Sequence, residues 1–202
     1  GLPTAFAKIK RGDTVIDLGS GAGNDCFVAR HEVGIEGKVI GVDFTPIMIQ
    51  KARENADKLG FNNVEFREGD IDDMPVNDEV ANVVVSNCVL NLVPNKPKVM
   101  GEIFRVLKPG GHFSISDIVL VGDLPKALRE DAEMYAGCVA GAIQRKDYLK
   151  MIDGYLDHYK INADRNMVHA QALTWSRTRG ARSGRVAFQY LQDLAGRMGV
   201  SL

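Results

Sequence analysis

The sequence lacks an excess of charge of either sign, with 25 lysine and arginine residues against 26 aspartate and glutamate residues. Such a chain has no long-range field that would attract nucleic acid or anionic lipid. It also lacks any apolar run approaching the roughly 20 residues that a membrane-spanning helix needs. Residues 1–10 show neither a basic lead before a long apolar run nor a small-residue cleavage pattern. We therefore expect no nucleic-acid partner, no membrane association, no export signal and a cytoplasmic location.

Cysteine is scarce: the chain contains Cys26, Cys88 and Cys138 and no Cys-x-x-Cys pair. An odd number of widely spaced cysteines in a chain of 202 residues, 45% of them hydrophobic, favours free thiols over a disulfide framework. The missing pair also disfavours a structural zinc site. A chain of this size and composition can bury one full hydrophobic core, so we expect one main domain.

Short apolar runs alternate with amphipathic stretches up to Asp117. Strands are predicted at 14–18, 38–42, 64–67, 80–85 and 112–116, and helices at 24–33, 46–59 and 98–107. The run Val80–Val85 is almost wholly apolar and β-branched, as in a strand covered on both faces. Lys108–Gly111 holds a proline and two glycines and is predicted to turn the chain before the last strand. The alternation indicates an α/β fold with a doubly wound, mostly parallel sheet.

The pattern changes after Asp117. Further helices are predicted at 125–135 and 146–155, with a small-residue stretch at 136–142 between them. We interpret residues 118–155 as a helical insertion over the sheet edge and include them in a main domain at 1–155. Residues 156–202 are predicted to form a C-terminal appendage of unassigned role, whose arginines most simply form a solvated basic surface.

A glycine-rich loop joins the first predicted strand to the first predicted helix. Glycines there let the backbone approach a bound ligand closely, which indicates a nucleotide-like ligand. The loop reads Asp17-Leu18-Gly19-Ser20-Gly21-Ala22-Gly23. Its Gly-x-Gly-x-Gly spacing differs from the Gly-x-Gly-x-x-Gly spacing that places helix amides beneath a dinucleotide's pyrophosphate. A nicotinamide enzyme is therefore disfavoured.

Acidic residues end the next two predicted strands. Asp43 follows the second strand, where a carboxylate can accept hydrogen bonds from both ribose hydroxyls of an adenosine group. Asp70 follows the third strand and can accept one from an adenine amino group. Because the carboxyl ends of parallel strands share one edge, the loop and both acids should line one crevice. The simpler alternative, that the glycines only permit a turn and the aspartates only cap local structure, does not explain why all of them fall at strand ends.

Together with residues 105–111 (RVLKPGG), these motifs resemble the class I S-adenosylmethionine-dependent methyltransferases over residues 4–118. The resemblance implies S-adenosylmethionine as the cofactor. It also implies that the cofactor is bound by Asp17, Gly19, Ser20, Gly21, Gly23, Asp43, Phe44, Asp70, Ile71 and Asn87. Acidic and carbonyl oxygens around Asp17 would suit a positively charged sulfonium, whereas a pyrophosphate there would be repelled.

The three thiols have places near this crevice. Cys26 falls in the first turn of the predicted helix 24–33, where the helix dipole is expected to lower the pKa of its thiol. Cys88 ends the fourth strand, where the methyl acceptor meets the sulfonium in this fold. Cys138 lies in the small-residue stretch, which can fold back over the crevice. A single free cysteine is more often a small core residue, but together Cys88 and Cys138 favour a shared site.

Four segments resemble the arsenite methyltransferases, at 17–27, 86–92 (SNCVLNL), 116–117 (SD) and 135–142 (YAGCVAGA). In that family thiolates hold trivalent arsenic, whose lone pair attacks the activated methyl group without a general base. The resemblance implies Cys88 and Cys138 as catalytic residues and as ligands of the arsenic(III) substrate, with Cys26 accessory. It further implies an external reductant of thioredoxin or glutathione type, because the methylated arsenic is pentavalent.

The chain differs from the arsenite methyltransferase pattern in two ways, and two other functions are compatible with its motifs. The family usually carries a further cysteine, in a Gly-Cys-Gly preceding the segment that begins here at Gly1, and its usual continuation is not matched after Tyr155. A C- or O-methyltransferase of the quinone or sterol type would share the cofactor half of the chain. A non-catalytic thiol protein that binds metalloids would share the cysteines. The sequence favours arsenite methylation, an arsenic detoxification reaction, by in-line transfer in which the fold supplies positioning and sulfur ligands.

Overall fold

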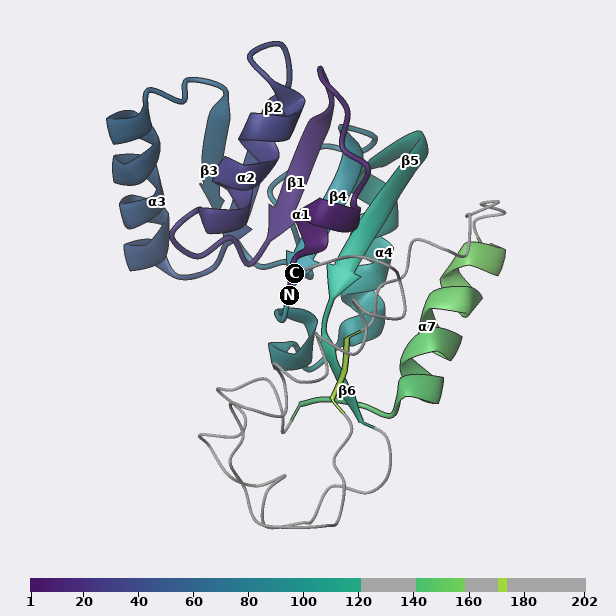
Figure 1. Cartoon of the computed structure of the whole chain (residues 1–202). Helices are drawn as coiled ribbons and strands as arrows, with labels where there is room; N and C mark the ends of the chain where they lie inside the picture. The colour runs from purple at the N-terminus through teal and green to yellow at the C-terminus, as the bar shows by residue number, and fades with distance from the viewer. Residues whose placement is uncertain (121–140, 159–170, 174–202) are drawn as a thin grey trace, which may run out of the picture.

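The computed structural model describes residues 1–120, 141–158 and 171–173. Its centre is one sheet of β1 (Thr14–Leu18), β2 (Lys38–Asp43), β3 (Val64–Glu68), β4 (Ala81–Asn87) and β5 (Leu107–Ser116). The strands lie in the order β3-β2-β1-β4-β5, and every neighbouring pair is parallel (Figure 1). The doubly wound fold is confirmed. The strand order reverses between β1 and β4, which is where open α/β sheets bind ligands.

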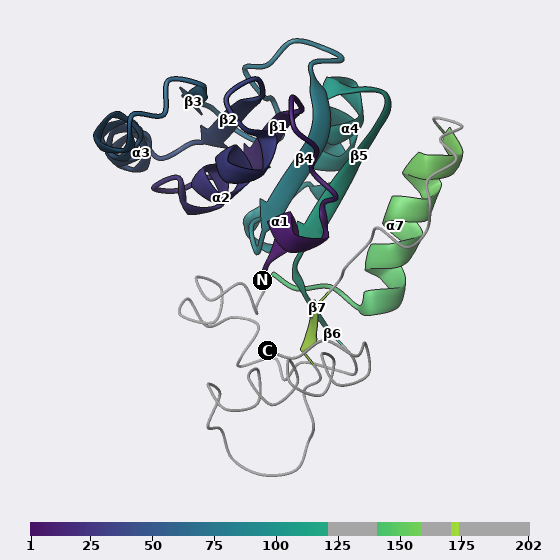
Figure 2. The same cartoon turned by 45° about the horizontal axis from the view of Figure 1, so that its top comes forward.

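Helices cover both faces of this sheet. The first face carries α1 (Pro3–Phe6), α2 (Asn24–Val33) and α3 (Pro46–Leu59), and the second carries α4 (Lys96–Val106) and α7 (Arg145–His158), as Figures 1 and 2 show. A short 3-10 helix, η1 (Leu90–Leu92), follows β4. A separate two-stranded sheet pairs β6 (Ile118–Leu120) with β7 (Gln171–Leu173).

The hydrophobic core is divided between the two faces because successive strand residues point in opposite directions. Val15 of β1 and Val83 of β4 pack with α2 and α3, whereas Ile16 and Val84 pack with α4 and α7. All four of these strand side chains have 0% exposure. The two central strands are therefore fixed from both sides, and their carboxyl ends form a rigid base for the loops that follow.

One predicted turn lies inside a strand. Ala81 pairs with Leu107, but the next pairing joins Val83 to His112, so Lys108–Gly111 have no partner in the register. These residues form an irregular bulge in β5 rather than a turn before it, and Gly110 takes a φ of 79° there. The proline and two glycines of Lys108–Gly111 thus correctly predicted an interruption of strand pairing. They did not predict that the chain continues in the same strand, β5, after the interruption.

The described part of the predicted insertion packs on a face of the sheet. Helix α7 extends to His158, past the predicted end at residue 155, and contacts α4. Its Tyr148 and Ile152 are each 1% exposed and belong to the core of the second face. The other predictions for this region, which are the helix at 125–135, the placement of Cys138 and most of the appendage at 156–202, lie outside the described residues. In the described parts of the chain no helix combines the length and apolarity needed to cross a membrane.

Candidate functional site

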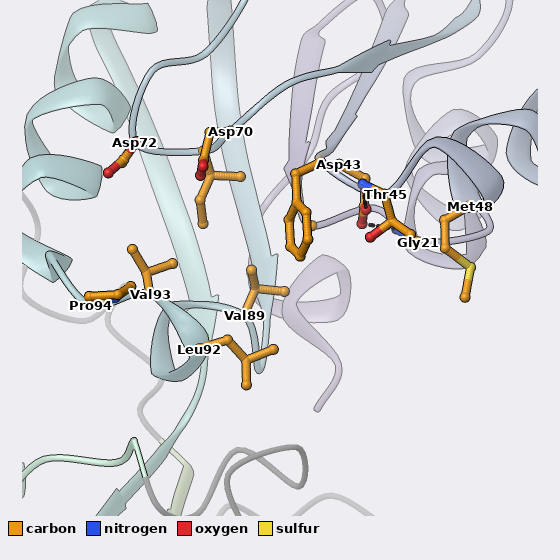
Figure 3. A pocket seen from close by; sticks show the side chains of 13 residues that line it. Gly21, Asp43, Thr45, Met48, Asp70, Asp72, Val89, Leu92, Val93 and Pro94 are labelled. Carbon is orange, nitrogen blue, oxygen red and sulfur yellow. Dashed lines mark hydrogen bonds between the residues drawn. The ribbon is translucent and has the colours of Figure 1, made fainter. Parts of the chain in front are cut away.

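A cavity of about 500 Å³ opens at the carboxyl edge of the sheet, where β1, β2, β3 and β4 end (Figure 3). Its lining residues are Gly19, Gly21, Asp43, Phe44, Thr45, Met48, Asp70, Ile71, Asp72, Val89, Leu92, Val93 and Pro94. Six of these, Gly19, Gly21, Asp43, Phe44, Asp70 and Ile71, were predicted from the sequence as cofactor-binding residues. The structure therefore brings six of the ten predicted cofactor residues together around one cavity.

The glycine loop is held against the end of β2. The amides of Gly19 and Ser20 both donate to the carbonyl oxygen of Val42, at 2.8 and 3.0 Å. Gly19 and Gly21 have φ values of 64° and 51°, in the left-handed region that favours glycine. A Cβ at Gly19 would lie 2.4 Å from a methyl carbon of Val89, whereas a Cβ at Gly21 would meet nothing within 4 Å. Gly19 thus allows close packing, and Gly21 leaves open space beside the cavity.

This difference gives a matched pair of substitutions. Gly19→Ala combines positive-φ strain with a clash and is expected to lower the free energy of unfolding by about 3 kcal/mol. Gly21→Ala adds only the strain, about 1 kcal/mol, but places a methyl group in the open space. We expect Gly21→Ala to keep the fold and to weaken ligand binding at least about tenfold. Chemical denaturation and calorimetric titration measure the two effects; equal stabilities of the variants would contradict the packing argument.

Asp43 holds the glycine loop in place through hydrogen bonds and can still accept further hydrogen bonds from a ligand. Its Oδ2 accepts a hydrogen bond from the Gly21 amide and its Oδ1 accepts one from the Thr45 amide, each at 2.9 Å. Thr45 is the N-cap residue of α3, so Asp43 fixes the turn that leads into the helix but does not cap the helix itself, as the simpler alternative had it. Each carboxylate oxygen has two lone pairs, so neither is saturated by one backbone amide. Asp43 can accept from a ligand's hydroxyl groups without losing its structural bonds.

The far part of the cavity has apolar walls with carboxylates at its rim. Phe44 is 70% exposed, Ile71 is 4% exposed, and both line the cavity together with Val89 and Leu92. In Figure 3, Asp70 lies across the opening from Val89 and Leu92. An apolar slot with a few polar groups at its edge suits a flat heterocycle such as adenine. The segment 89–94 was not predicted to contribute, although its place directly after the fourth strand could have indicated it.

The other four predicted cofactor residues do not line this cavity: Asp17, Ser20, Gly23 and Asn87. Gly23 is the N-cap of α2, and the Asn87 side-chain amide donates to Oδ2 of Asp25 at 2.9 Å. Ser20 is 7% exposed, and its hydroxyl has no hydrogen-bond partner among the described residues. A buried hydroxyl without a partner is costly, so a polar ligand group there would complete its hydrogen bonding.

Asp17 and Cys26 form a buried pair beneath the loop. The thiol of Cys26 donates to Oδ2 of Asp17 at 3.2 Å, and the two residues are 0% and 2% exposed, respectively. Burial, with the neighbouring carboxylates of Asp25 and Asp43, raises the pKa of Asp17 to about 8. Burial and the carboxylate of Asp17 also raise the pKa of the Cys26 thiol well above its usual value. The prediction that the helix dipole lowers this thiol pKa is wrong, because desolvation outweighs the dipole at a fully buried position.

The raised pKa of Asp17 predicts a pH-dependent stability. Because the folded-state pKa of about 8 lies above the reference value of 3.8, this group's contribution is present below pH 3.8 and is lost as pH rises through about 8. Asp17→Asn cannot ionise and should lack this component. Between about pH 6 and about pH 9, we expect the Tm of the wild type to fall by about 5 °C more than that of Asp17→Asn. Thermal melts across this range test it, and parallel Tm profiles of the two proteins would contradict it.

Cys88 lies directly after β4 in a strained conformation. Its φ is 61°, a left-handed value that is unfavourable for a residue with a side chain. Its amide donates to the Ser116 carbonyl oxygen at 2.7 Å, which ties the end of β4 to the end of β5. Burial raises the pKa of the Cys88 thiol, and the carboxylates of Asp117 and Asp25 add to this effect. The next residue, Val89, lines the cavity, so Cys88 stands at the border of the pocket.

A comparison with protein families identifies the domain. The family model described as "Methyltransferase domain" matches residues 9–155. The chain belongs to this methyltransferase family. A second model, described as "Protein of unknown function (DUF815)", matches residues 140–198, most of which lie outside the described residues.

Several named methyltransferases are similar to this chain. It is 54% identical over 153 residues to an arsenite methyltransferase of Halobacterium salinarum. The matched segment covers 76% of this chain and 39% of that protein. It is 39% identical over 142 residues to an arsenite methyltransferase of Homo sapiens, and this match covers 66% of this chain and 38% of that protein. The chain thus spans about two fifths of the length of the arsenite methyltransferases that it matches.

The chain is also similar to a methyltransferase of known structure and to a quinone methyltransferase. The crystal structure of an arsenic(III) S-adenosylmethionine methyltransferase from Chlamydomonas reinhardtii has a TM-score of 0.65 and 37% identity, covering 73% of this chain and 52% of that one. A demethylmenaquinone methyltransferase of Listeria welshimeri is 32% identical over 110 residues, covering 54% of this chain and 47% of that protein. The quinone enzyme therefore shares a shorter part of the chain at lower identity.

Proposed function

We propose that this methyltransferase domain transfers the methyl group of S-adenosylmethionine to trivalent arsenic held by cysteine thiolates. The observation that carries the proposal is Cys88, a strained thiol-bearing residue at the switch-point edge of the sheet, beside the ligand cavity. The identity of 54% to an arsenite methyltransferase supports the choice of acceptor. A quinone C- or O-methyltransferase would have no use for a thiol at this position.

The residues of the site fit S-adenosylmethionine. Asp43 has acceptor capacity for the ribose hydroxyls, and Phe44, Asp70 and Ile71 provide an apolar slot with a carboxylate for the adenine. The methionine end is assigned to Asp17, Gly19, Ser20, Gly21, Gly23 and Asn87. The unpartnered Ser20 hydroxyl and the open space at Gly21 support this assignment. When bound, the cofactor supplies an electrophilic methyl group on a sulfonium.

The chain's own contribution is to hold arsenic and to orient it. In this proposal Cys88 and Cys138 bind arsenic through soft sulfur, which leaves the arsenic lone pair available. Attack of that lone pair forms an arsenic–carbon bond while the sulfur–methyl bond breaks, so arsenic is oxidised from the trivalent to the pentavalent state. Two electrons restore it, supplied by a thioredoxin-type dithiol or by two glutathione-type thiols, which are oxidised to a disulfide. Cys26 acts only indirectly, through its hydrogen bond to Asp17. A cytoplasmic location belongs to this proposal because the reductant is found there.

The test is a transfer assay with the whole chain. Methyl-labelled S-adenosylmethionine is incubated with arsenite and excess dithiol, and in parallel with a demethylated quinol as the acceptor. Labelled methylarsenic and no labelled quinone is the expected result. Label on the quinol alone would replace the proposal by the quinone reaction. Binding of arsenite without any transfer, in the presence of bound cofactor, would favour a metalloid-binding protein.

A further inference from the structure

Two opposite walls of the cofactor cavity are both connected to α4. Residues 89–94, which form one wall, lead directly into this helix, because Asn95 is its N-cap residue. Residues 70–72 line the other wall and belong to the segment 69–80, which joins β3 to β4. In Figure 3 the labelled side chains of these two walls lie on opposite sides of the opening. The helix is therefore placed so that it can fix one wall relative to the other.

Two side chains of α4 bind the backbone of the segment 69–80. The guanidinium group of Arg105 donates to the carbonyl oxygens of Met74 and Val76, at 3.1 and 2.7 Å. Oε2 of Glu102 accepts a hydrogen bond from the amide of Met74 at 2.7 Å. Arg105 and Glu102 also form a bidentate ion pair, in which Nε and Nη2 each donate to a carboxylate oxygen at 2.7 Å. The ion pair thus binds both backbone groups of Met74.

Further contacts follow the same side of the helix toward the cavity. Lys98 lies four residues before Glu102, a spacing that places both on one helix face. Its Nζ lies 3.3 Å from Oδ1 of Asp72, which lines the cavity. At the other end, Arg105 donates to Oδ1 of Asp78 at 2.7 Å. Charged side chains of α4 therefore hold the segment from a cavity-lining residue almost to the start of β4.

The ion pair adds something that apolar packing does not supply. The side chains of Met74 and Val76 are 4% and 6% exposed and pack with Ile103 of α4 in the core of the second face. This burial holds the segment on the helix, whereas the directional hydrogen bonds fix the orientation of its peptide groups. Arg105 lowers the pKa of Glu102, and the amide of Met74 adds to this effect, so the carboxylate is ionised at neutral pH.

From these contacts we infer that Arg105, together with Glu102, is a positioning residue that holds Asp70 in place and thereby makes the cavity selective for adenine. The inference rests on the assignment of Asp70 to the adenine in the proposed function. A fixed carboxylate accepts a hydrogen bond from the amino group of adenine, but it repels the carbonyl oxygen that hypoxanthine carries at that position. A carboxylate on a loosened segment can turn away from this oxygen, so the selectivity would be lost.

The ribose contact is independent of this ion pair. Asp43 ends β2, and its carboxylate is fixed by the amides of Gly21 and Thr45. None of these three residues belongs to α4 or to the segment 69–80. Loosening that segment should therefore affect recognition of the base and leave recognition of the ribose unchanged. A general loss of stability would instead weaken both.

The experiment is a calorimetric titration of the full chain with adenosine, inosine and 2′,3′-dideoxyadenosine. Inosine carries a carbonyl oxygen in place of the adenine amino group, and the dideoxy compound lacks the ribose hydroxyls. The wild type should bind adenosine at least about tenfold more tightly than either. Arg105→Lys keeps the positive charge but loses the planar fork that binds several acceptors at once. Its preference over inosine should fall to about twofold or less, with the preference over the dideoxy compound unchanged.

Arg53→Lys is the matched control. Arg53 of α3 also donates to a backbone carbonyl oxygen, that of Phe66, at 2.7 Å, but neither residue lines the cavity. This variant should keep both preferences. If Arg105→Lys keeps the wild-type preference over inosine, or loses both preferences together, the ion pair is only structural and the inference is wrong.

A second variant decides if Arg105→Lys does not fold. Glu102→Gln has nearly the same shape but directs an amide group at the donors of Arg105 or Met74. It should lower the preference over inosine by at least about threefold and keep the preference over the dideoxy compound; an unchanged preference over inosine would overturn the inference. A wild type that binds adenosine and inosine equally is a different outcome, since it refutes the assignment of Asp70 within the proposed function. The titrations involve no methyl acceptor, so they do not depend on its identity.

Discussion

Replacing Cys88 with serine is expected to reduce methyl transfer to arsenite by about 1000-fold or more, with the affinity for S-adenosylmethionine changed by less than about twofold. Serine has nearly the same shape and can adopt the same backbone conformation. Its oxygen, however, is a hard ligand that stays protonated at neutral pH and binds arsenic(III) poorly compared with thiolate sulfur. The labelled transfer assay and a calorimetric titration of the cofactor measure the two quantities.

The strained backbone at Cys88 provides a second variant for the same question. A φ of 61° costs a residue with a Cβ about 1 kcal/mol, and glycine escapes this cost. Cys88→Gly should therefore raise the Tm by about 2–4 °C while abolishing transfer. Stability and activity would then change in opposite directions, as expected where strain is kept for function. Transfer by Cys88→Ser at more than about a tenth of the wild-type rate would mean that arsenic is held elsewhere.

The fold could be predicted closely because its signals are local. The helix predicted at 46–59 begins and ends at the observed residues, since Pro46 suits a first helical position and Gly60 takes the left-handed conformation that ends a helix. The apolar run at 80–85 predicted the central strand β4 because a strand buried on both faces needs no alternation. Lys108–Gly111 shows where prediction from local signals fails. Its composition predicts an interruption of strand pairing but cannot distinguish a turn before a new strand from a bulge within one strand.

The site was predictable only in part, because several of its properties depend on contacts between distant segments. The positions of Gly19, Asp43 and Asp70 followed from their places at strand ends. The raised pKa of Cys26 did not, because it requires a fully buried helix face and the carboxylate of Asp17 from another element. The hydrogen bond from Arg105 to Met74 joins residues 31 positions apart, between a helix and a connecting segment whose contact has no sequence motif.

Asp43→Asn is expected to weaken the binding of S-adenosylmethionine by about 100-fold. Both carboxylate oxygens of Asp43 accept from backbone amides, of Gly21 and Thr45. Asparagine retains one oxygen and directs an N–H group at the other amide, so one of these bonds is lost and two donors face each other. The negative charge that strengthens hydrogen bonds from the ribose hydroxyls is lost as well. Calorimetric titration of wild type, Asp43→Asn and the exposed control Asp57→Asn measures the change.

A ligand series separates the ribose contact from the distortion of the loop. Adenosine and 2′,3′-dideoxyadenosine differ only in the two hydroxyls, so the wild type should bind adenosine more tightly by about tenfold or more. Asp43→Asn should bind the two nucleosides with nearly equal affinity, because the acceptor for the hydroxyls is impaired. If the preference survives in Asp43→Asn, the carboxylate only fixes the glycine loop and the turn before α3, and the ribose is bound by another group. Because Gly21 bonds to the same side chain, Gly21→Ala should weaken both nucleosides equally, which distinguishes a blocked cavity from a lost acceptor.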